Sequence, residues 1–176
     1  MIDMSQKTES MMKKISVSKV VLNMGVGKSG EPIERAKRAL QQIAGQKPSP
    51  RMARATQRDW GVHKGEPIGV AVTVRKQPAI DLLKRLFAAK GNQLKSSSFD
   101  DFGNISFGIR EHIDIPGVKY DPNIGIVGLN ISIALARPGF NIRVRSKHKA
   151  SVGQGHIITA DDAKHFLGSE FGIQVV

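Results

Sequence analysis

Hydrophobic and polar residues alternate along four stretches of this chain, and a period of two predicts β-strands. The four stretches are residues 15–25, 68–75, 104–113 and 128–137. In three other stretches the hydrophobic residues lie three and four positions apart, which predicts helices. These are residues 31–45, 78–91 and 158–172. This order of elements favours an α+β fold, with a mainly antiparallel sheet and helices packed on one of its faces.

The ends of two predicted helices carry residues suited to those positions. Glu31 and Glu34 favour the positive end of a helix dipole, and Gly45 can adopt the left-handed conformation that ends a helix. Thr159 precedes the last helix and Asp162 stands three residues further on, which predicts a capping box. The other segments are less regular. We expect one further strand at most in the basic, proline-broken residues 47–67, a flexible arm over residues 1–14, and a single domain over residues 15–176.

Each predicted strand has one apolar face and one face of small, polar or basic residues. In the first strand, Val20, Leu22 and Met24 form the apolar face. The second face comprises Lys19, Val21, Asn23, Ala71, Thr73, Arg75, Asn104, Ser106, Gly108, Arg110, Asn130, Ser132, Ala134 and Ala136. It contains no acid, and its Asn, Thr, Lys and Arg residues suit ribose, base edges and phosphates. We therefore expect an open RNA-binding face, although the same pattern also fits a face that is only solvated.

The composition of this second face favours folded RNA over single-stranded RNA. Its Gly, Ala and Ser residues allow a bulky partner to approach the backbone closely. It lacks the aromatic side chains on which unpaired bases stack. Recognition of the shape of a structured RNA is the interpretation that agrees with both observations.

The charge of the chain supports a polyanionic partner. Its 176 residues include 27 Lys and Arg against 15 Asp and Glu, a net charge of +12 that concentrates anions around the protein. A hydrophobic share of 40% is enough for a folded core. The chain has no Cys and no apolar stretch of membrane-spanning length, so we expect a cytoplasmic protein without a membrane partner.

Basic residues gather in two segments. Residues 46–64 hold one group and residues 137–149 hold another, which contains no acid. Such runs are commonly only solvated, but two of them together with an acid-free sheet face favour nucleic acid. Trp60 lies in a polar loop within the first segment. We expect the loop to protrude as a second contact, or Trp60 to anchor it as a hydrophobic residue.

The turn from Gly25 to Gly30 has the spacing G-x-G-x-x-G between a strand and a helix, so a nucleotide-binding enzyme is an alternative. No acidic residue follows about 20 positions later to bind a ribose, and the turn is better interpreted as a helix start that can hold an RNA phosphate. The five His residues are not paired at metal-ligand spacing. We expect no catalytic residue, metal or cofactor; a general basic nucleic-acid chaperone is a further alternative.

Several separated segments resemble a known family, the fifth protein of the large ribosomal subunit. They are KVVLNMGVG, IAGQKP, GEPIGVAVTVR, SFDDFGNISFGI, YDPNIGIVGLNI and ARPG. The resemblance extends from about residue 14 to residue 176, and YDPNIGIVG and RVRSKHKA are similar to the archaeal and eukaryotic branch. It implies a non-catalytic constituent of the large subunit that binds 5S rRNA in the central protuberance.

The resemblance also implies functional residues. In this family the open sheet face and its first strands bind 5S rRNA, and the loop over residues 56–64 reaches the tRNA in the peptidyl site. The candidate rRNA-binding residues, from the resemblance, the face and the basic segments together, are Lys19, Asn23, Gln46, Lys47, Arg51, Arg54, Thr73, Arg75, Asn104, Ser106, Arg110, Arg137, Arg143, Arg145 and Lys147. The candidate tRNA-facing residues are Thr56, Gln57, Arg58, Asp59, Trp60, His63 and Lys64. The further partners implied are large-subunit rRNA, neighbouring proteins of the central protuberance and a small-subunit head protein.

Overall fold

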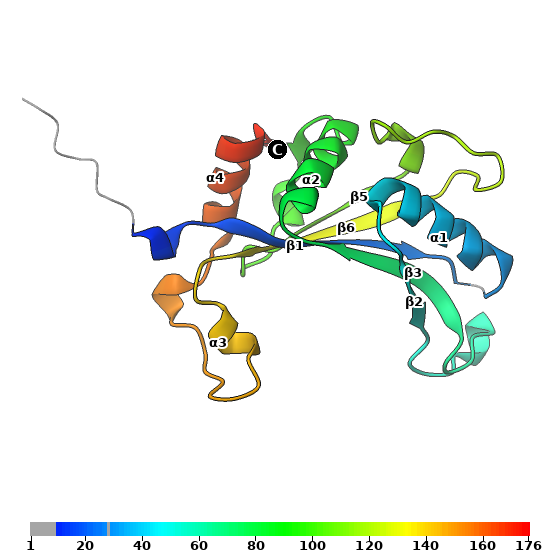
Figure 1. Ribbon diagram of the computed structural model, residues 1–176, viewed down its shortest axis with the longest axis horizontal. Helices are drawn as coiled ribbons and strands as arrows, with labels where there is room; N and C mark the ends of the chain where they lie inside the picture. The colour runs from blue at the N-terminus through cyan, green and yellow to red at the C-terminus, as the bar shows by residue number, and fades with distance from the viewer. Residues whose placement is uncertain (1–9, 28) are drawn as a thin grey trace, which may run out of the picture.

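Five antiparallel strands form the main sheet of the structure, a computed structural model that describes residues 10–27 and 29–176. The strands are β1 (Ser16–Gly25), β2 (Ser49–Met52), β3 (Pro67–Val74), β5 (Ile105–Ile109) and β6 (Leu129–Ala136). Their order across the sheet is β2-β3-β1-β6-β5, as Figure 1 shows. Because β1 pairs with both β3 and β6, the sheet joins segments that are far apart in the sequence.

Three of the four α-helices found in the described residues cover one face of this sheet. The helices are α1 (Glu31–Ala44), α2 (Gln77–Ala89), α3 (Asn141–Val144) and α4 (Ala160–Phe171). In Figure 1, α1, α2 and α4 lie on one side of the sheet and the short α3 lies on the other. This arrangement confirms the predicted α+β fold. None of the helices that the structure describes has the length and apolar character that a membrane crossing requires.

The hydrophobic core lies between the sheet and these three helices. Val20, Leu22 and Met24 on β1 are fully buried, as the alternation along this strand predicted. The side chains that α1 contributes to the core are Ile33, Ala36, Ala39, Leu40 and Ile43. Burial of each large apolar side chain stabilises the fold by about 1.5–3 kcal/mol, so this layer fixes which face of the sheet is covered.

The predicted helix ends are found at the expected residues. Gly45 follows α1 with φ 65°, and its N–H donates to the Gln41 carbonyl oxygen. At the start of α4, the Thr159 hydroxyl accepts a hydrogen bond from the Asp162 N–H, and the Asp162 carboxylate accepts one from the Thr159 N–H. The capping box therefore satisfies backbone groups that the start of a helix leaves without partners.

Other elements differ from the predictions in their extent. The strand expected over residues 104–113 ends at Ile109, because the chain then turns into a 3-10 helix at His112–Asp114. A pair of parallel two-residue strands, β4 (Gln93–Leu94) and β7 (Gln174–Val175), was not predicted, since so short a strand has no detectable period. Within the predicted arm, Met11–Lys13 form a 3-10 helix, and residues 1–9 lie outside the described residues.

His112 is a buried polar residue in the connection that follows β5. Its side chain is 0% exposed, its Nδ1 accepts a hydrogen bond from the Val127 N–H at 3.4 Å, and its Nε2 has no partner among the described residues. Its own N–H donates to the Val127 carbonyl oxygen, so His112 ties the loop before β6 to the end of β5. Burial lowers the pKa of His112 below 6.5, because a charged imidazolium is poorly solvated there.

We expect acid to destabilise the protein through His112. The imidazole is neutral in both states above pH 6.5, its ordinary pKa, whereas below that pH the unfolded chain takes up the proton more readily. The free energy of unfolding should therefore fall as the pH drops from about 6.5 toward the lowered pKa, by at most about 1.4 kcal/mol per pH unit. Urea unfolding of the wild type and His112→Asn at pH 7.5 and 5.0 measures this difference. An equal fall in both proteins would assign the acid sensitivity to other groups.

Candidate nucleic-acid interface

Two rows of small and polar residues cross the face of the sheet opposite α1 and α2. In the strand register, the first row reads Ser49, Ala71, Asn23, Asn130 and Gly108. The second row reads Thr73, Val21, Ser132 and Ser106. Neither row contains an acid. Most side chains of the two rows are exposed, including Asn23, Ser106, Asn130 and Ser132. We call these two rows the polar rows.

Basic side chains lie beside the polar rows. Arg51 on β2 is exposed and stands in register with Gly69 and Gly25, two positions that carry no side chain. A Cβ at Gly69 would lie 2.9 Å from the Met24 carbonyl oxygen, so the close strand packing there requires glycine. The half-buried Lys19 lies opposite Ala134.

The remaining candidates near the face are Arg75 after β3, Arg110 after β5, and Gln46 and Lys47 between α1 and β2. All four side chains are exposed. They lie at the ends of strands or in the connection before β2, which places amide and cationic groups around the edges of the polar rows.

Two residues of the predicted face have different surroundings from those expected. Ala71 is only 3% exposed, because Ser49 and Asn23 occupy the adjacent strand positions on either side of its methyl group. Asn104 precedes β5 and belongs to a turn, where its amide nitrogen donates to the Asp100 carboxylate at 3.2 Å. An acid therefore lies next to Asn104, although no acid occupies a position in the polar rows.

The connection between β2 and β3, residues 53–66, projects to the side of the sheet away from α1 and α2 (Figure 1). Its base is closed by hydrogen bonds from the Ala53 N–H to the Glu66 carbonyl oxygen and from the Gly65 N–H to the Ala53 carbonyl oxygen, at 2.8 and 2.9 Å. Nearer its tip, Gln57 and Val62 exchange two backbone hydrogen bonds. The loop is therefore an ordered hairpin, and we call it the β2–β3 hairpin.

The carboxylate of Glu66 fixes the β2–β3 hairpin to the turn before α1. It accepts hydrogen bonds from the Ser29 hydroxyl and from the His63 N–H, and these two bonds lower its pKa. At the tip, Trp60 is 79% exposed in a 3-10 helix at Arg58–Trp60. Trp60 is thus not a hydrophobic anchor within this chain, and the hairpin presents it to the surroundings.

The tRNA-facing candidates all lie in this hairpin and remain predictions. Thr56, Gln57, Arg58, Asp59, Trp60, His63 and Lys64 are exposed. The Thr56 hydroxyl accepts a hydrogen bond from the Lys64 N–H at 3.1 Å, which holds the two arms of the hairpin together. Arg54 is also exposed. It lies near the base of the hairpin, two residues after the end of β2, and is therefore close to the sheet.

A second projection, residues 137–157, includes α3 and lies on the same side of the sheet as the β2–β3 hairpin but at the other end (Figure 1). We call it the α3 segment. A backbone bond from the Ala150 N–H to the Ile142 carbonyl oxygen and a side-chain bond from Arg145 Nε to the His148 carbonyl oxygen close its loop. The exposed cations that it carries are Arg143, Arg145, Lys147 and Lys149.

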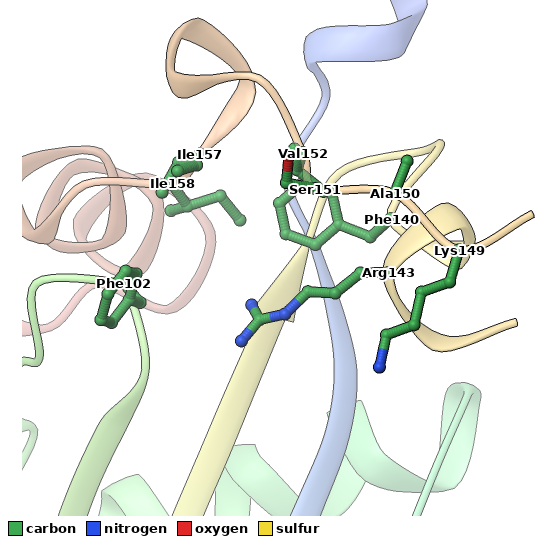
Figure 2. Close-up of a pocket in the computed structure, with 9 residues that line it drawn as sticks. All are labelled: Phe102, Phe140, Arg143, Lys149, Ala150, Ser151, Val152, Ile157 and Ile158. Carbon is green, nitrogen blue, oxygen red and sulfur yellow. The ribbon is translucent and has the colours of Figure 1, made fainter.

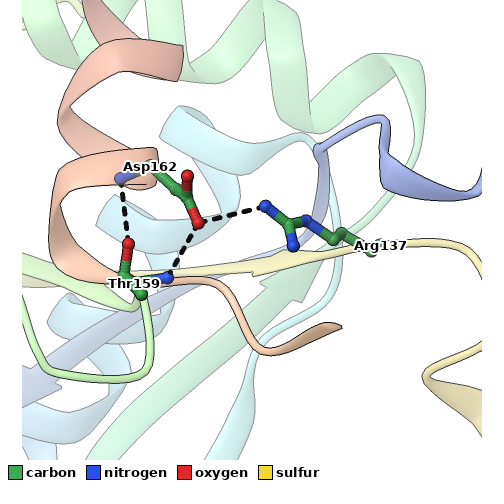
Figure 3. A network of polar contacts seen from close by, with 3 residues as sticks. All are labelled: Arg137, Thr159 and Asp162. Carbon is green, nitrogen blue, oxygen red and sulfur yellow. Dashed lines mark hydrogen bonds and ion pairs between the residues drawn. The ribbon is translucent and has the colours of Figure 1, made fainter. Parts of the chain in front are cut away.

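Arg137, at the start of the α3 segment, has an internal partner. Its guanidinium donates to the Asp162 carboxylate at 3.0 Å, and its side chain is only 11% exposed. Figure 3 shows that the same carboxylate oxygen accepts from the Thr159 N–H, at 3.2 Å. Arg137 thus fastens the α3 segment to the start of α4, and this bond leaves little of its surface for a phosphate.

The structure also identifies residues that the candidate set omitted. Asn130 lies directly beside Asn23, and Ser132 lies between Val21 and Ser106, near the middle of the polar rows. Alternation placed both residues on this face but gave no register, so their central position could not be recognised. Lys149 stood out in the sequence only as part of a basic run, whereas the fold places it beside Arg143.

The fold argues against nucleotide binding at the turn from Gly25 to Gly30. Both neighbours of β1 are antiparallel, whereas a dinucleotide-binding turn follows a strand of a parallel sheet. The N–H groups of Val26 and Gly27 both donate to the Ile68 carbonyl oxygen at 2.9 Å, so they are not free to bind a phosphate. Over residues 10–27 and 29–176, no group of His, Asp and Glu side chains is arranged to hold a metal ion.

Comparison with known proteins identifies the class of the chain. Residues 10–63 match the family profile "Ribosomal protein L5", and residues 67–174 match the profile of the C-terminus of the same ribosomal protein family. A large ribosomal subunit protein uL5 of Nitrosopumilus maritimus is 69% identical over 98% of this chain and 99% of its own. The uL5 proteins of Cenarchaeum symbiosum and Pyrobaculum aerophilum are 63% and 45% identical, over 94% and 93% of this chain and 98% and 92% of their own.

The antiparallel sheet, the basic surface and these relatives define a structural protein of the large ribosomal subunit. The chain belongs to the uL5 family, also called ribosomal protein L5, in its archaeal form. It is therefore a component of cytoplasmic ribosomes that takes part in translation. The first profile ends within the β2–β3 hairpin and the second begins at the start of β3, but β1 from the first matched segment pairs with β3 and β6 from the second.

Proposed function

We propose that this protein binds 5S rRNA in the large subunit, with the RNA lying on the polar rows between the β2–β3 hairpin and the α3 segment. One observation carries the proposal: an acid-free surface of small and amide side chains is bounded at each end by a basic projection (Figure 1). Small side chains let a ribose-phosphate backbone approach the sheet, and the projections supply positive charge beside it.

The proposed interface divides affinity and selectivity between different residues. Arg51, Arg75 and Arg110 neutralise phosphates, which contributes affinity that depends on salt. Asn23 and Asn130 form an adjacent pair of amides that can bond 2′-hydroxyls or base edges and so distinguish one RNA shape from another. Within this proposal the β2–β3 hairpin, with the exposed Trp60 at its tip, reaches the tRNA in the peptidyl site.

The test of this proposal is filter binding of in vitro transcribed archaeal 5S rRNA at moderate salt. Arg75→Ala is expected to weaken binding about tenfold and to reduce the salt slope by about one, as loss of one phosphate contact does. Asn23→Ala is expected to weaken binding about fivefold with an unchanged salt slope, since it removes a neutral hydrogen bond. Neither exposed residue supports the core, so the thermal unfolding of both variants should match that of the wild type.

Lys84→Ala is the matched control, because Lys84 is exposed on α2, on the helix-covered side of the sheet. It removes one positive charge, as Arg75→Ala does, but should leave 5S rRNA binding unchanged. Equal loss in both variants would mean that only net charge matters. Equal competition by bulk duplex RNA and DNA would instead favour the alternative function, a general nucleic-acid chaperone.

A further inference from the structure

A hollow of about 450 Å³ opens between the α3 segment and the turn before β5. Its lining residues are Phe102, Phe140, Arg143, Lys149, Ala150, Ser151, Val152, Ile157 and Ile158. Phe102 is far from the others in sequence, so the hollow exists only in the folded protein. The α3 segment, which supplies most of the lining residues, projects from one end of the sheet (Figure 1).

The walls of the hollow are aromatic and aliphatic, and they are held in place. The Phe140 ring packs edge-on against the His156 ring, with 5.6 Å between centroids, and a His156 ring nitrogen bonds the Pro138 carbonyl oxygen at 2.9 Å. Ile158 is fully buried beneath the turn that carries Phe102. Phe102 itself is 57% exposed, although a large aromatic side chain loses stabilisation when it remains in water.

Two cations lie beside these aromatic rings. Arg143 and Lys149 are both exposed, and neither forms an ion pair with any residue of the described chain. Figure 2 shows Phe102 and Phe140 on opposite sides of the hollow, with the Arg143 guanidinium directed toward the space between them. The hollow therefore joins a planar apolar surface to positive charge, which is the combination that a nucleotide requires.

We propose that this hollow accepts one unpaired nucleotide of the RNA that lies on the polar rows. Its base contacts the Phe102 and Phe140 rings, and its phosphate lies near Arg143 and Lys149. The inference rests on the proposed RNA-binding function and adds to it a single-nucleotide site away from the sheet. An apolar side chain of a neighbouring protein would fill the same walls, but it would not use the two exposed cations, which a phosphate binds by charge-assisted hydrogen bonds.

The experiment uses the isotopically labelled full-length protein and follows its NMR signals during titration with the oligonucleotide tetraadenylate. We expect saturable shifts of Phe102, Phe140 and Arg143 signals. Inorganic tripolyphosphate carries charge but no base. It should shift the NMR signals of Arg143 and Lys149 but cause no saturable shift of the Phe102 and Phe140 signals. Phe102→Ala should weaken tetraadenylate binding about tenfold, as expected for one lost base–aromatic stack, and Phe102→Tyr should restore it.

The outcomes separate this inference from the proposed function. Equal affinity of wild type and Phe102→Ala, or an equal aromatic response to tripolyphosphate, would overturn the nucleotide site. Asn23→Ala should weaken 5S rRNA binding yet leave the tetraadenylate shifts unchanged, because Asn23 lies on the sheet and not in the hollow. Saturable shifts in a protein that shows no preference for 5S rRNA would overturn the proposed function and leave the nucleotide site standing.

Discussion

Replacing Ser132 with glutamate is expected to lower the affinity for 5S rRNA about a hundredfold. Ser132 is exposed near the middle of the polar rows, in register with Val21 on one side and Ser106 on the other. A glutamate there adds both bulk and negative charge where the ribose-phosphate backbone must come closest to the sheet. Desolvating an unpaired carboxylate against phosphates costs several kcal/mol, so the effect should exceed that of removing any one cation.

The matched control is Gln41→Glu, which changes the net charge equally but lies on the exposed side of α1. Its 5S rRNA affinity should stay within about twofold of the wild type, because screened charges far from the interface act weakly. Filter binding at two salt concentrations, together with thermal unfolding of each variant, measures the difference. Near-wild-type affinity of a folded Ser132→Glu protein would show that the RNA lies elsewhere.

Gly103→Ala should destabilise the protein by about 3 kcal/mol, the sum of backbone strain and overpacking. Gly103 has φ 70°, which an L-residue adopts with difficulty, and a Cβ there would lie 2.5 Å from Ile158 Cγ2. Ile158 cannot move aside easily, because its side chain is fully buried in the core. Urea unfolding at neutral pH measures the loss, and the hollow beside Phe102 should be distorted as well.

Gly125→Ala provides a control that separates the two causes. Gly125 has φ 73°, but a Cβ there would meet no atom within 4 Å. This variant therefore carries only the backbone strain, about 1 kcal/mol. If both variants lost the same stability, contact with Ile158 would not contribute, and the turn before β5 would be more adaptable than the packing suggests.

Alternation in the sequence was enough to predict which strand residues face the core. The buried Val20, Leu22 and Met24 on β1 follow it without exception, because helices cover only one face of the sheet. It could not predict register, which depends on pairing between strands that are distant in the chain. Alternation placed both Asn23 and Asn130 on the second face, but only Asn23 was a candidate, because the family resemblance implied it; their pairing became visible in the strand register.

The candidate site was harder to predict wherever a residue finds its partner through the tertiary fold. Arg137 belongs to a basic run, but Asp162 lies 25 residues later and takes up its guanidinium. The aromatic residues Phe102 and Phe140 are also distant in sequence, and no local pattern indicates that they line one hollow. Composition therefore predicted an RNA-binding surface. The fold shows which cations of the basic run are exposed and which one, Arg137, forms an internal ion pair.

The central place of β1 bears on how this protein is made. Its first pairing, with β3, spans about fifty residues, whereas its second, with β6, joins Ser16 to Ala136. During synthesis, the N-terminal half can form the β2-β3-β1 portion while one long edge of β1 still lacks its hydrogen-bond partner. Pairing across so many residues is slow, and an unpaired edge invites association with other chains. Early binding of the nascent chain by a chaperone would shield that edge of β1 until β6 has been synthesised and can pair with it.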